Sequence, residues 1–420
     1  MTAKVAITGV GLVTPVGISA ESSFSALLSG KNGIVNLPEL VKAGFPVTSA
    51  GVISEFEELV RKEPQAANTT SRKAVFGATA LREALSQAGS SAATSGRGGI
   101  FLGVETGRIN INKLFSMFVD SGTQKCIDPK RFGEKSFRFL DKNEALSKHP
   151  YFVPNFLSEL FGIKGEIRSV SNACSSSNQA IGEGFRKVAL GQLDWAIVGG
   201  TDDMVDLYML SGFYLLGALS TGYPPEKSSR PFDARRKGFV LGEGSGMLFI
   251  ESLERALARK AKPIALIGGY SSGASGLKIT ETNPEGVLMA MKEAISQAGA
   301  GSDEIDYINA HGTGTAMNDA AETEAIKKYF GSRASAIPVN STKSMIGHTI
   351  AAAGAIEAVV TAMSIQRGEI HPTVNIEFPD PELDLDYVST GSRKLVIRNA
   401  ISNSLGFAGV NSSLVFSKYN

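Results

Sequence analysis

Residues Ser171–Ala180 read SNACSSSNQA, and they join a strand-like run, Ile167–Val170, to a helical pattern that extends to Leu190. A strand that passes through a small polar turn into a helix is the repeating unit of α/β folds. The turn places Cys174 at a helix N-terminus, where unpaired N–H groups and the helix dipole favour the thiolate. We therefore expect a lowered thiol pKa and a reactive cysteine. The alternative is a buried, unreactive cysteine that packs as a small apolar residue.

Strand and helix patterns alternate along the rest of the chain. The predicted strands are Val5–Thr8, Gly99–Val104, Ala196–Gly200, Gly246–Glu251, Pro263–Gly268, Tyr307–Ala310, Pro338–Ser341, Asn399–Ser402 and Ser413–Phe416. The predicted helices are Ala20–Leu28, Ser71–Ala88, Leu253–Arg259, Glu285–Ala298, Ala320–Phe330 and Ala352–Gln366. Apolar strands between such helices predict an α/β protein whose sheet is covered on both faces.

The pattern divides the chain into two halves of similar βα character, residues 1–255 and 256–420. The N-terminal half carries Cys174 and an insertion near residues 107–155. Within it, Thr123–Pro154 is charged and aromatic without clear periodicity, so we expect an irregular surface segment. The two halves show no strong sequence self-similarity, and the repeat is therefore one of architecture.

Composition excludes several classes of protein. The 420 residues include 42 basic and 41 acidic side chains, a balance that does not favour nucleic acids or anionic membranes as partners. Two cysteines cannot build a disulfide framework, which favours a reducing compartment. Cysteine and histidine positions show no metal-ligand spacing. No stretch reads as a signal peptide or a membrane span, so we expect a soluble cytoplasmic protein without a metal.

Three further segments combine glycine with polar side chains at the ends of predicted strands. Residues 309–315 (NAHGTGT) place His311 at the carboxyl end of a strand, where α/β folds locate ligand sites. A second segment, NSTKSMIGH, carries Lys343 and His348. Residues 403–411 (NSLGFAGVN) form a glycine-rich turn between the last two strands. An isolated histidine is usually structural, but two of the four histidines here lie in such turns.

A lysine so close to a buried strand end needs an acidic partner. Glu322, near the start of the helix after His311, and Glu357, in the helix after His348, are both candidates for pairing with Lys343.

One other motif suggests different chemistry. Residues Gly269–Gly273 match G-x-S-x-G, the signature of a serine hydrolase elbow, and histidines lie downstream. The elbow must lead into a helix, whereas the residues that follow read as a loop. A serine hydrolase is therefore a weak alternative.

The segments around Cys174, His311 and His348 resemble those of the elongating β-ketoacyl-acyl carrier protein synthases, the ketosynthases of fatty acid synthase II and type II polyketide synthases. The motifs are ACSS at Cys174, HGTGT from His311, KSxxGH ending at His348, and the PFD and GFVLGEG block of residues 231–244. The resemblance covers nearly the whole chain. A Cys-His-His set is similar to the elongating type, whereas the initiating type has Cys-His-Asn.

This resemblance implies the thiolase fold, a five-layered αβαβα arrangement of two related halves. It implies decarboxylative Claisen condensation of an acyl group with malonyl-acyl carrier protein, without a cofactor. The expected partners are acyl carrier protein and a second subunit, either a copy of the chain or a ketosynthase-like paralogue. A non-catalytic subunit similar to the chain-length factors is the main alternative, but those proteins lack the nucleophilic cysteine.

The family also implies roles for individual residues. Cys174 would carry the acyl group, and its backbone N–H, together with that of Phe407, would form the oxyanion hole. His311 and His348 would donate hydrogen bonds to the malonyl thioester oxygen. Lys343 would order the histidine site, with Glu322 orienting it. Phe407 resembles the gating residue of the family. Phe213 resembles a residue that lines the acyl pocket.

The sequence departs from the family pattern at several places. Gly217 stands where a typical fatty-acid ketosynthase has an arginine that contacts the carrier protein. Ala408 replaces a glycine in the gating turn, where glycine tolerates a positive φ at low cost. The Thr123–Pro154 stretch is longer than in housekeeping enzymes. These departures predict a specialised ketosynthase with an unusual acyl substrate.

Overall fold

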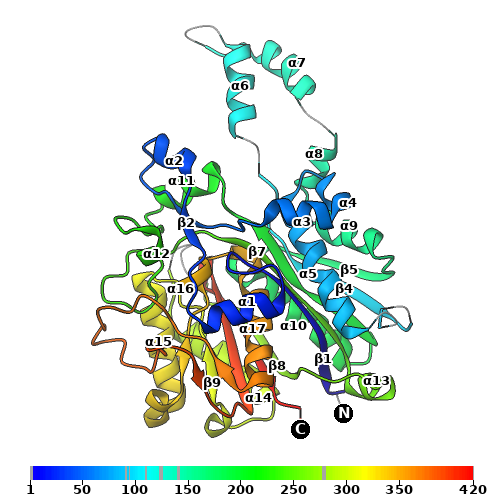
Figure 1. Cartoon of the computed structure of the whole chain (residues 1–420), viewed down its shortest axis with the longest axis vertical. Coiled ribbons are helices and arrows are strands. Elements are labelled where there is room, and N and C mark those ends of the chain that lie inside the picture. Colours follow the sequence, from blue (N-terminus) through cyan, green and yellow to red (C-terminus); the bar gives the residue numbers. More distant parts are fainter. Residues whose placement is uncertain are drawn as a thin grey trace.

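The computed structural model describes residues 3–89, 92–93, 95–108, 111–122, 126–139, 142–276 and 281–419 (Figure 1). Its central feature is a ten-stranded sheet with the order β10-β9-β13-β14-β8-β1-β7-β6-β4-β5. The strands are β1 (Val5–Val13), β4 (Gly98–Gly103), β5 (Gly165–Val170), β6 (Trp195–Asp203), β7 (Glu243–Ser252), β8 (Ala265–Ala274), β9 (Tyr307–Asn309), β10 (Val339–Asn340), β13 (Asn399–Gly406) and β14 (Val410–Ser417).

This sheet is built twice from the same five-strand plan. In the N-terminal half the order is β5-β4-β6-β7-β1, and in the C-terminal half it is β10-β9-β13-β14-β8. In each half the first three strands are parallel, and the fourth runs antiparallel to its neighbours. The halves meet where β1 pairs with β8 over only three residues, Val5–Ile7. The two related halves that the sequence predicts are therefore present.

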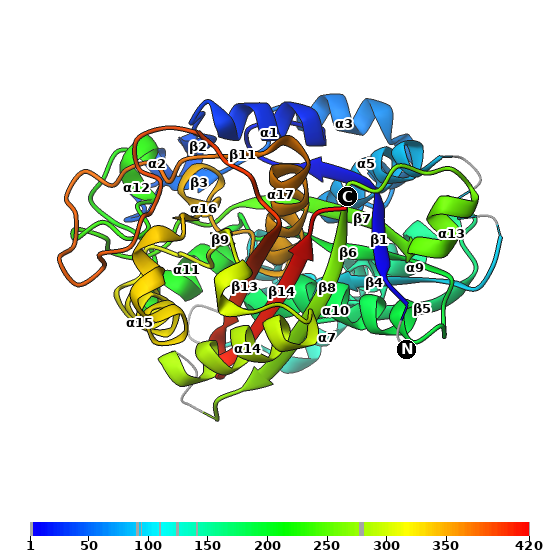
Figure 2. The ribbon, with the colours of Figure 1, turned by 90° about the horizontal axis from the view of Figure 1, so that it is seen from below.

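Helices form three layers around the two half-sheets. Helix α5 (Arg72–Ala88) packs on the outer face of the N-terminal half, and α14 (Pro284–Gln297) and α15 (Ala316–Phe330) lie outside the C-terminal half. Helices α10 (Ser176–Ala189) and α17 (Ala353–Arg367) pack against each other between the half-sheets. Figure 2 shows α5 and α14 on opposite sides of the molecule. This is the five-layered αβαβα arrangement of a thiolase fold.

Close packing explains part of the glycine content. A Cβ at Gly11 of β1 would lie 1.8 Å from the carbonyl oxygen of Ala80 in α5. Glycine therefore lets the helix backbone approach the strand directly. β1 continues through this glycine to Val13, beyond the predicted end at Thr8.

The remaining elements are short. The strands are β2 (Ile34–Asn36), β3 (Ser49–Gly51), β11 (Glu369–Ile370) and β12 (Arg393–Lys394). The helices are α1 (Ala20–Leu28), α2 (Pro38–Lys42), α3 (Phe56–Lys62), α4 (Pro64–Ala67), α11 (Leu207–Leu215), α12 (Pro225–Ser228), α13 (Leu253–Ala258) and α16 (Lys343–Ile346). The predicted bounds of α1 are confirmed. No helix within the described ranges is long and apolar enough to cross a membrane.

The insertion corrects one prediction, because it is helical rather than irregular. It contains α6 (Ile111–Ser121), α7 (Pro129–Phe139), α8 (Lys142–Ser147) and α9 (Phe152–Leu160). Helices α6 and α7 pack against each other and project from the body of the molecule (Figure 1). Their mutual contact includes Phe118 and Phe132, whose ring centroids lie 5.0 Å apart. The two helices are amphipathic and pack apolar residues against each other, so their apolar faces are formed by a local pairing rather than by the main core.

Candidate active site

Cys174 lies in a tight turn between β5 and α10. A 3₁₀ turn, Ala173–Ser175, precedes the helix, and Ala173 has φ of 50°, which is uncommon for a residue with a side chain. The Cys174 side chain is buried. The hydroxyl of Ser175 donates to the carbonyl oxygens of Ser404 and Val410, at 3.1 and 3.2 Å. These bonds tie the cysteine turn to the two ends of the glycine-rich turn between β13 and β14.

His311 follows β9 and is held through its backbone. Its N–H donates to one carboxylate oxygen of Glu322 at 2.9 Å, and the N–H of Gly312 donates to the other at 3.0 Å. Asn403 also donates to Glu322, at 3.1 Å. Glu322 is therefore an anchor for the strand-end loop that carries the imidazole.

His348 reaches Cys174 from the C-terminal half. Gly347, with φ of 74°, ends α16 and turns the chain so that His348 enters the site. The imidazole Nε2 lies 3.0 Å from Sγ of Cys174. The Nδ1 atom accepts the backbone N–H of Ile350 at 3.2 Å. The proton of the neutral ring is thus on Nε2, facing the cysteine.

Lys343 bonds to the second imidazole and to a buried carboxylate. Its Nζ donates to Nδ1 of His311 at 3.2 Å and forms an ion pair with Glu357. This places the His311 proton on Nε2 as well. The predicted orientation of Lys343 by Glu322 is wrong, because Glu322 is occupied by backbone N–H groups and Glu357 is the partner of the lysine.

The two rings and the thiol form one cluster. The His311 and His348 rings are 5.2 Å apart between centroids and inclined by 81°, and the possible ligand atoms of the three residues lie within 4.8 Å of one another. A thiophilic metal would need lone pairs on both Nε2 atoms. The donors at both Nδ1 atoms oppose that tautomer, so the cluster is arranged to donate hydrogen bonds rather than to bind a metal.

Burial has the largest influence on the pKa values of the site residues. Desolvation raises the pKa of the Cys174 thiol to about 12, although the Lys343 ammonium acts to lower it. The expected lowering of the thiol pKa by the helix N-terminus is therefore wrong for this buried cysteine. Burial, with the Lys343 charge second, holds the pKa values of His311 and His348 well below the ordinary range. Both imidazoles are neutral near pH 7.

A cavity of about 240 Å³ opens onto these groups. Phe213 and Phe407 line it, and their ring centroids are 6.1 Å apart. Phe239 packs edge-on against both Phe213 and His348. Gly217, which has a positive φ, also lines this cavity. The cavity thus joins the residues that were predicted for the acyl pocket and the gate to the cysteine and both histidines.

The serine hydrolase alternative fails on geometry. Gly269–Gly273 lies within β8, which continues to Ala274 and pairs with β14. The hydroxyl of Ser271 donates to Glu293 at 2.7 Å. The segment continues the strand that was predicted to end at Gly268 and is not a strand-to-helix elbow, so its serine lacks the exposed position of a nucleophile.

Family comparison agrees with this arrangement. Residues 2–256 match the model of the β-ketoacyl synthase N-terminal domain, and residues 264–377 match that of the C-terminal domain. The chain belongs to the β-ketoacyl synthase family. Two curated relatives are named 3-oxoacyl-[acyl-carrier-protein] synthase 2. One, from Synechocystis, is 34% identical over 99% of this chain and 98% of its own length. The other, from Staphylococcus aureus, is 35% identical with the same coverage.

Solved structures give the same result for the fold. A β-ketoacyl synthase from Burkholderia phymatum shares 30% identity and a TM-score of 0.88, with both chains fully covered. The ishigamide ketosynthase/chain length factor shares 27% identity and a TM-score of 0.88, again over both full chains. A type II polyketide ketosynthase solved with its acyl carrier protein has a TM-score of 0.87 at 27% identity and the same coverage.

One polar contact of this β-ketoacyl synthase was missed from the sequence. Glu105 follows β4, and its carboxylate accepts the backbone N–H of Ala173 at 3.0 Å. An acidic residue directly after a buried strand was the available signal. Sequence alone does not show that β4 and β5 are neighbours, and that pairing brings Glu105 to the cysteine turn.

Proposed function

We propose that this β-ketoacyl synthase condenses an acyl group held on Cys174 with malonyl-acyl carrier protein and releases a β-ketoacyl-acyl carrier protein. The observation that supports this most strongly is the pair of Nε2–H groups of His311 and His348, fixed by donors at both Nδ1 atoms and grouped with the Cys174 thiol. Two neutral hydrogen-bond donors beside a nucleophile are suited to stabilise a substrate oxygen that becomes negatively charged during the reaction.

The first half-reaction is acyl transfer. Sγ of Cys174 attacks the carbonyl carbon of the acyl thioester, a tetrahedral intermediate forms, and the carbon–sulfur bond to the carrier breaks. The thiol proton leaves with the carrier sulfur. The backbone N–H groups of Cys174 and Phe407 would stabilise the oxyanion.

The second half-reaction forms the carbon–carbon bond. Malonyl thioester loses CO₂, and the electron pair of the broken bond becomes an enolate whose oxygen accepts hydrogen bonds from His311 and His348. The enolate carbon attacks the acyl carbonyl on Cys174, the carbon–sulfur bond breaks, and the sulfur takes up a proton. Lys343 holds the His311 tautomer and adds positive potential, so we assign it a supporting role.

Departures from the usual pattern support a specialised acyl substrate. Gly217 presents no side chain at the cavity, Ala408 stiffens the turn of Phe407, and the insertion carries the projecting α6–α7 hairpin. The proposed partners are acyl carrier protein and a second ketosynthase-like subunit, identical or paralogous. The proposed location is the cytoplasm, and the proposed chemistry uses no cofactor.

The decisive experiment incubates the protein with a panel of acyl-carrier and coenzyme A thioesters and records its intact mass. A mass increase that disappears in Cys174→Ala identifies the acyl group. Cys174→Ala should lose condensation completely but keep some malonyl decarboxylation, because both histidines remain. Absence of acylation from every thioester would favour the alternative of a non-catalytic subunit similar to a chain-length factor. Preference for ordinary medium-chain acyl groups would contradict specialisation.

A further inference from the structure

Glu105 makes a set of contacts with the cysteine turn that the reaction described above does not use. Its Oε1 atom accepts the N–H of Ala173 at 3.0 Å, and its Oε2 atom accepts the hydroxyl of Ser171 at 2.8 Å. Oε1 also lies 3.3 Å from the hydroxyl of Ser176. One carboxylate therefore contacts residues on both sides of Cys174.

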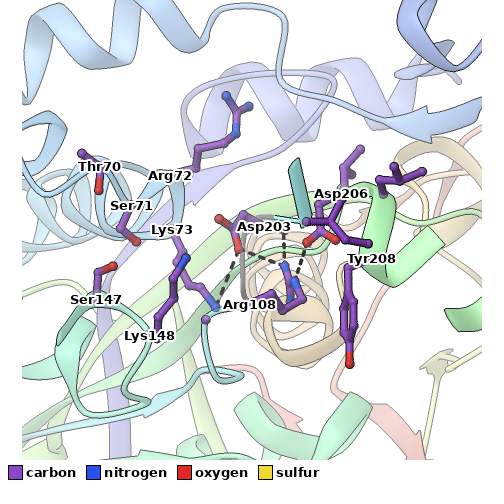
Figure 3. A pocket seen from close by; sticks show the side chains of 14 residues that line it. Thr70, Ser71, Arg72, Lys73, Arg108, Ser147, Lys148, Asp203, Asp206 and Tyr208 are labelled. Atoms are coloured by element: carbon purple, nitrogen blue, oxygen red, sulfur yellow. Dashed lines mark hydrogen bonds and ion pairs between the residues drawn. The ribbon is translucent and has the colours of Figure 1, made fainter. Parts of the chain in front are cut away.

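The backbone around Glu105 is fixed on the side away from the cysteine. Lys73 donates to the carbonyl oxygen of Glu105 at 2.7 Å and lies 3.3 Å from Asp202. Three residues further on, Arg108 donates to the carbonyl oxygen of Asp203 at 2.7 Å and pairs with Asp206. Figure 3 shows Lys73, Asp203, Arg108 and Asp206 joined in one polar network. The loop after β4 is thus held at Glu105 itself and again at Arg108.

The turn that Glu105 contacts has an unfavourable backbone conformation at Ala173. Ala173 has φ of 50°, a left-handed conformation that costs a residue with a Cβ about 1 kcal/mol or more. Such conformations persist where surrounding bonds determine them. The N–H of Ala173 is bonded by Glu105, and its carbonyl accepts the Ser176 hydroxyl at 2.6 Å.

We propose that Glu105 is a positioning residue that fixes the Cys174 turn for acyl transfer and, through its negative charge, restrains the reactivity of the thiol. The proposal rests on the proposed function, since acyl transfer is the step that needs the fixed turn. Hydrogen bonding and charge are separable in this residue. Glutamine keeps an acceptor for Ala173 but removes the charge, whereas alanine removes both.

The charge of Glu105 shifts the pKa of the Cys174 thiol in a defined direction. The Glu105 carboxylate acts to raise the pKa of the Cys174 thiol, after burial and against the lowering effect of Lys343. A nearby negative charge disfavours a second one on sulfur. Its removal therefore increases the thiolate fraction at any pH below the thiol pKa.

The test compares Glu105→Gln, Glu105→Ala and a control, Glu159→Gln, at an exposed glutamate of α9. Iodoacetamide alkylation of Cys174 is followed across pH, and acyl loading is followed by intact mass. Glu105→Gln should alkylate about threefold to tenfold faster at pH 7.5, with its pH profile shifted down, and should load acyl groups normally. Glu105→Ala should load about tenfold to a hundredfold more slowly, since the turn is no longer held. The control should match the wild type in both assays.

Loading of Glu105→Ala at the wild-type rate, or an unshifted alkylation profile in Glu105→Gln, would overturn the proposal. If Glu105→Ala does not fold, the alkylation profile of Glu105→Gln still decides the charge effect, and its loading rate decides whether an acceptor is sufficient. Failure of the wild type to load any acyl group would instead count against the proposed function. Iodoacetamide would still report the influence of Glu105 on the thiol in that case.

Discussion

In His311 and His348, different kinds of hydrogen-bond donor at Nδ1 keep the ring proton on Nε2. For His348 the donor is the backbone N–H of Ile350, which every substitution except proline would keep. For His311 it is the side chain of Lys343, whose charge is balanced by Glu357. The His311 tautomer therefore depends on a buried ion pair, and substitutions in that pair separate its structural role from its catalytic one.

Lys343→Met should lower malonyl decarboxylation by about a hundredfold, because His311 loses both the donor at Nδ1 and the adjacent positive potential. It should also reduce the free energy of unfolding by about 3 kcal/mol, since Glu357 is left unpaired in the interior. Adding Glu357→Gln should restore most of the stability but not the activity. Urea unfolding and CO₂ release measure the two effects. Recovery of activity in the double variant would contradict a catalytic contribution from Lys343.

At the residue scale, the sequence predicts which side chains meet but not what burial does to them. Cys174, His311 and His348 were identified because each lies in a polar turn next to a predicted strand or helix. The raised pKa of the Cys174 thiol reflects desolvation, which a local reading of the helix N-terminus does not include. Whether Glu322 or Glu357 pairs with Lys343 likewise depends on which backbone N–H groups face each carboxylate.

At the scale of elements, the gating turn between β13 and β14 carries a conformational constraint. Ala408 has φ of 60° and ψ of 24°, so the position that the family pattern gives to glycine has the expected left-handed conformation. Phe407 precedes it and lines the cavity. An alanine there restricts the alternatives open to the turn, and with them the movement of the Phe407 ring.

Ala408→Gly should leave the free energy of unfolding within about 1 kcal/mol, because relief of the left-handed strain and the added entropy of the unfolded chain offset each other. It should increase amide hydrogen exchange in residues 405–410 and speed the loading of bulky acyl groups. Ala408→Val is the matched control, because a β-branched residue fits this conformation poorly and should destabilise the turn. Unchanged exchange in the glycine variant would show that Ala408 does not limit the gate.

Element prediction succeeded where local pattern and tertiary context agree, as in α1. It failed at the end of the predicted strand Pro263–Gly268, because β8 continues through Gly269–Gly273, although the glycines and serines there favour a loop locally. Pairing with β14 on one side makes this segment a continuation of β8. It failed also in α6 and α7, whose apolar residues pack on each other. In both cases the deciding contact is with a segment that local periodicity does not reveal.

For the whole molecule, the repeated topology explains why the active site forms between the halves. α10 precedes β6 in one half, and α17 precedes the equivalent β13 in the other. Each central helix is preceded by a 3₁₀ turn whose first residue has a positive φ, Ala173 in one case and Ile350 in the other. Packing of α10 against α17 brings both turns together. Cys174, within the first turn, and His348, two residues before the second, meet because this packing brings the two turns together.

A third histidine is buried beside β10 and makes stability depend on pH. His371 is fully buried, donates from Nδ1 to the carbonyl oxygen of Pro372 at 2.8 Å and accepts the hydroxyl of Thr342 at Nε2. Desolvation lowers its pKa to about 4. The unfolded chain binds a proton below about pH 6.5 that the folded protein does not. Stability from this residue is therefore present above that pH and is lost as the pH falls towards 4.

The wild type should lose about 1.4 kcal/mol of unfolding free energy per pH unit through His371 between pH 6.5 and the lowered pKa. His371→Gln removes this titration, so acidification from pH 7.5 to pH 5 should destabilise it about 2 kcal/mol less than the wild type. Urea unfolding at the two pH values measures the difference. His149→Gln, at an exposed histidine, should follow the wild type. Parallel pH dependence of His371→Gln and the wild type would show that His371 does not stay neutral in the folded protein.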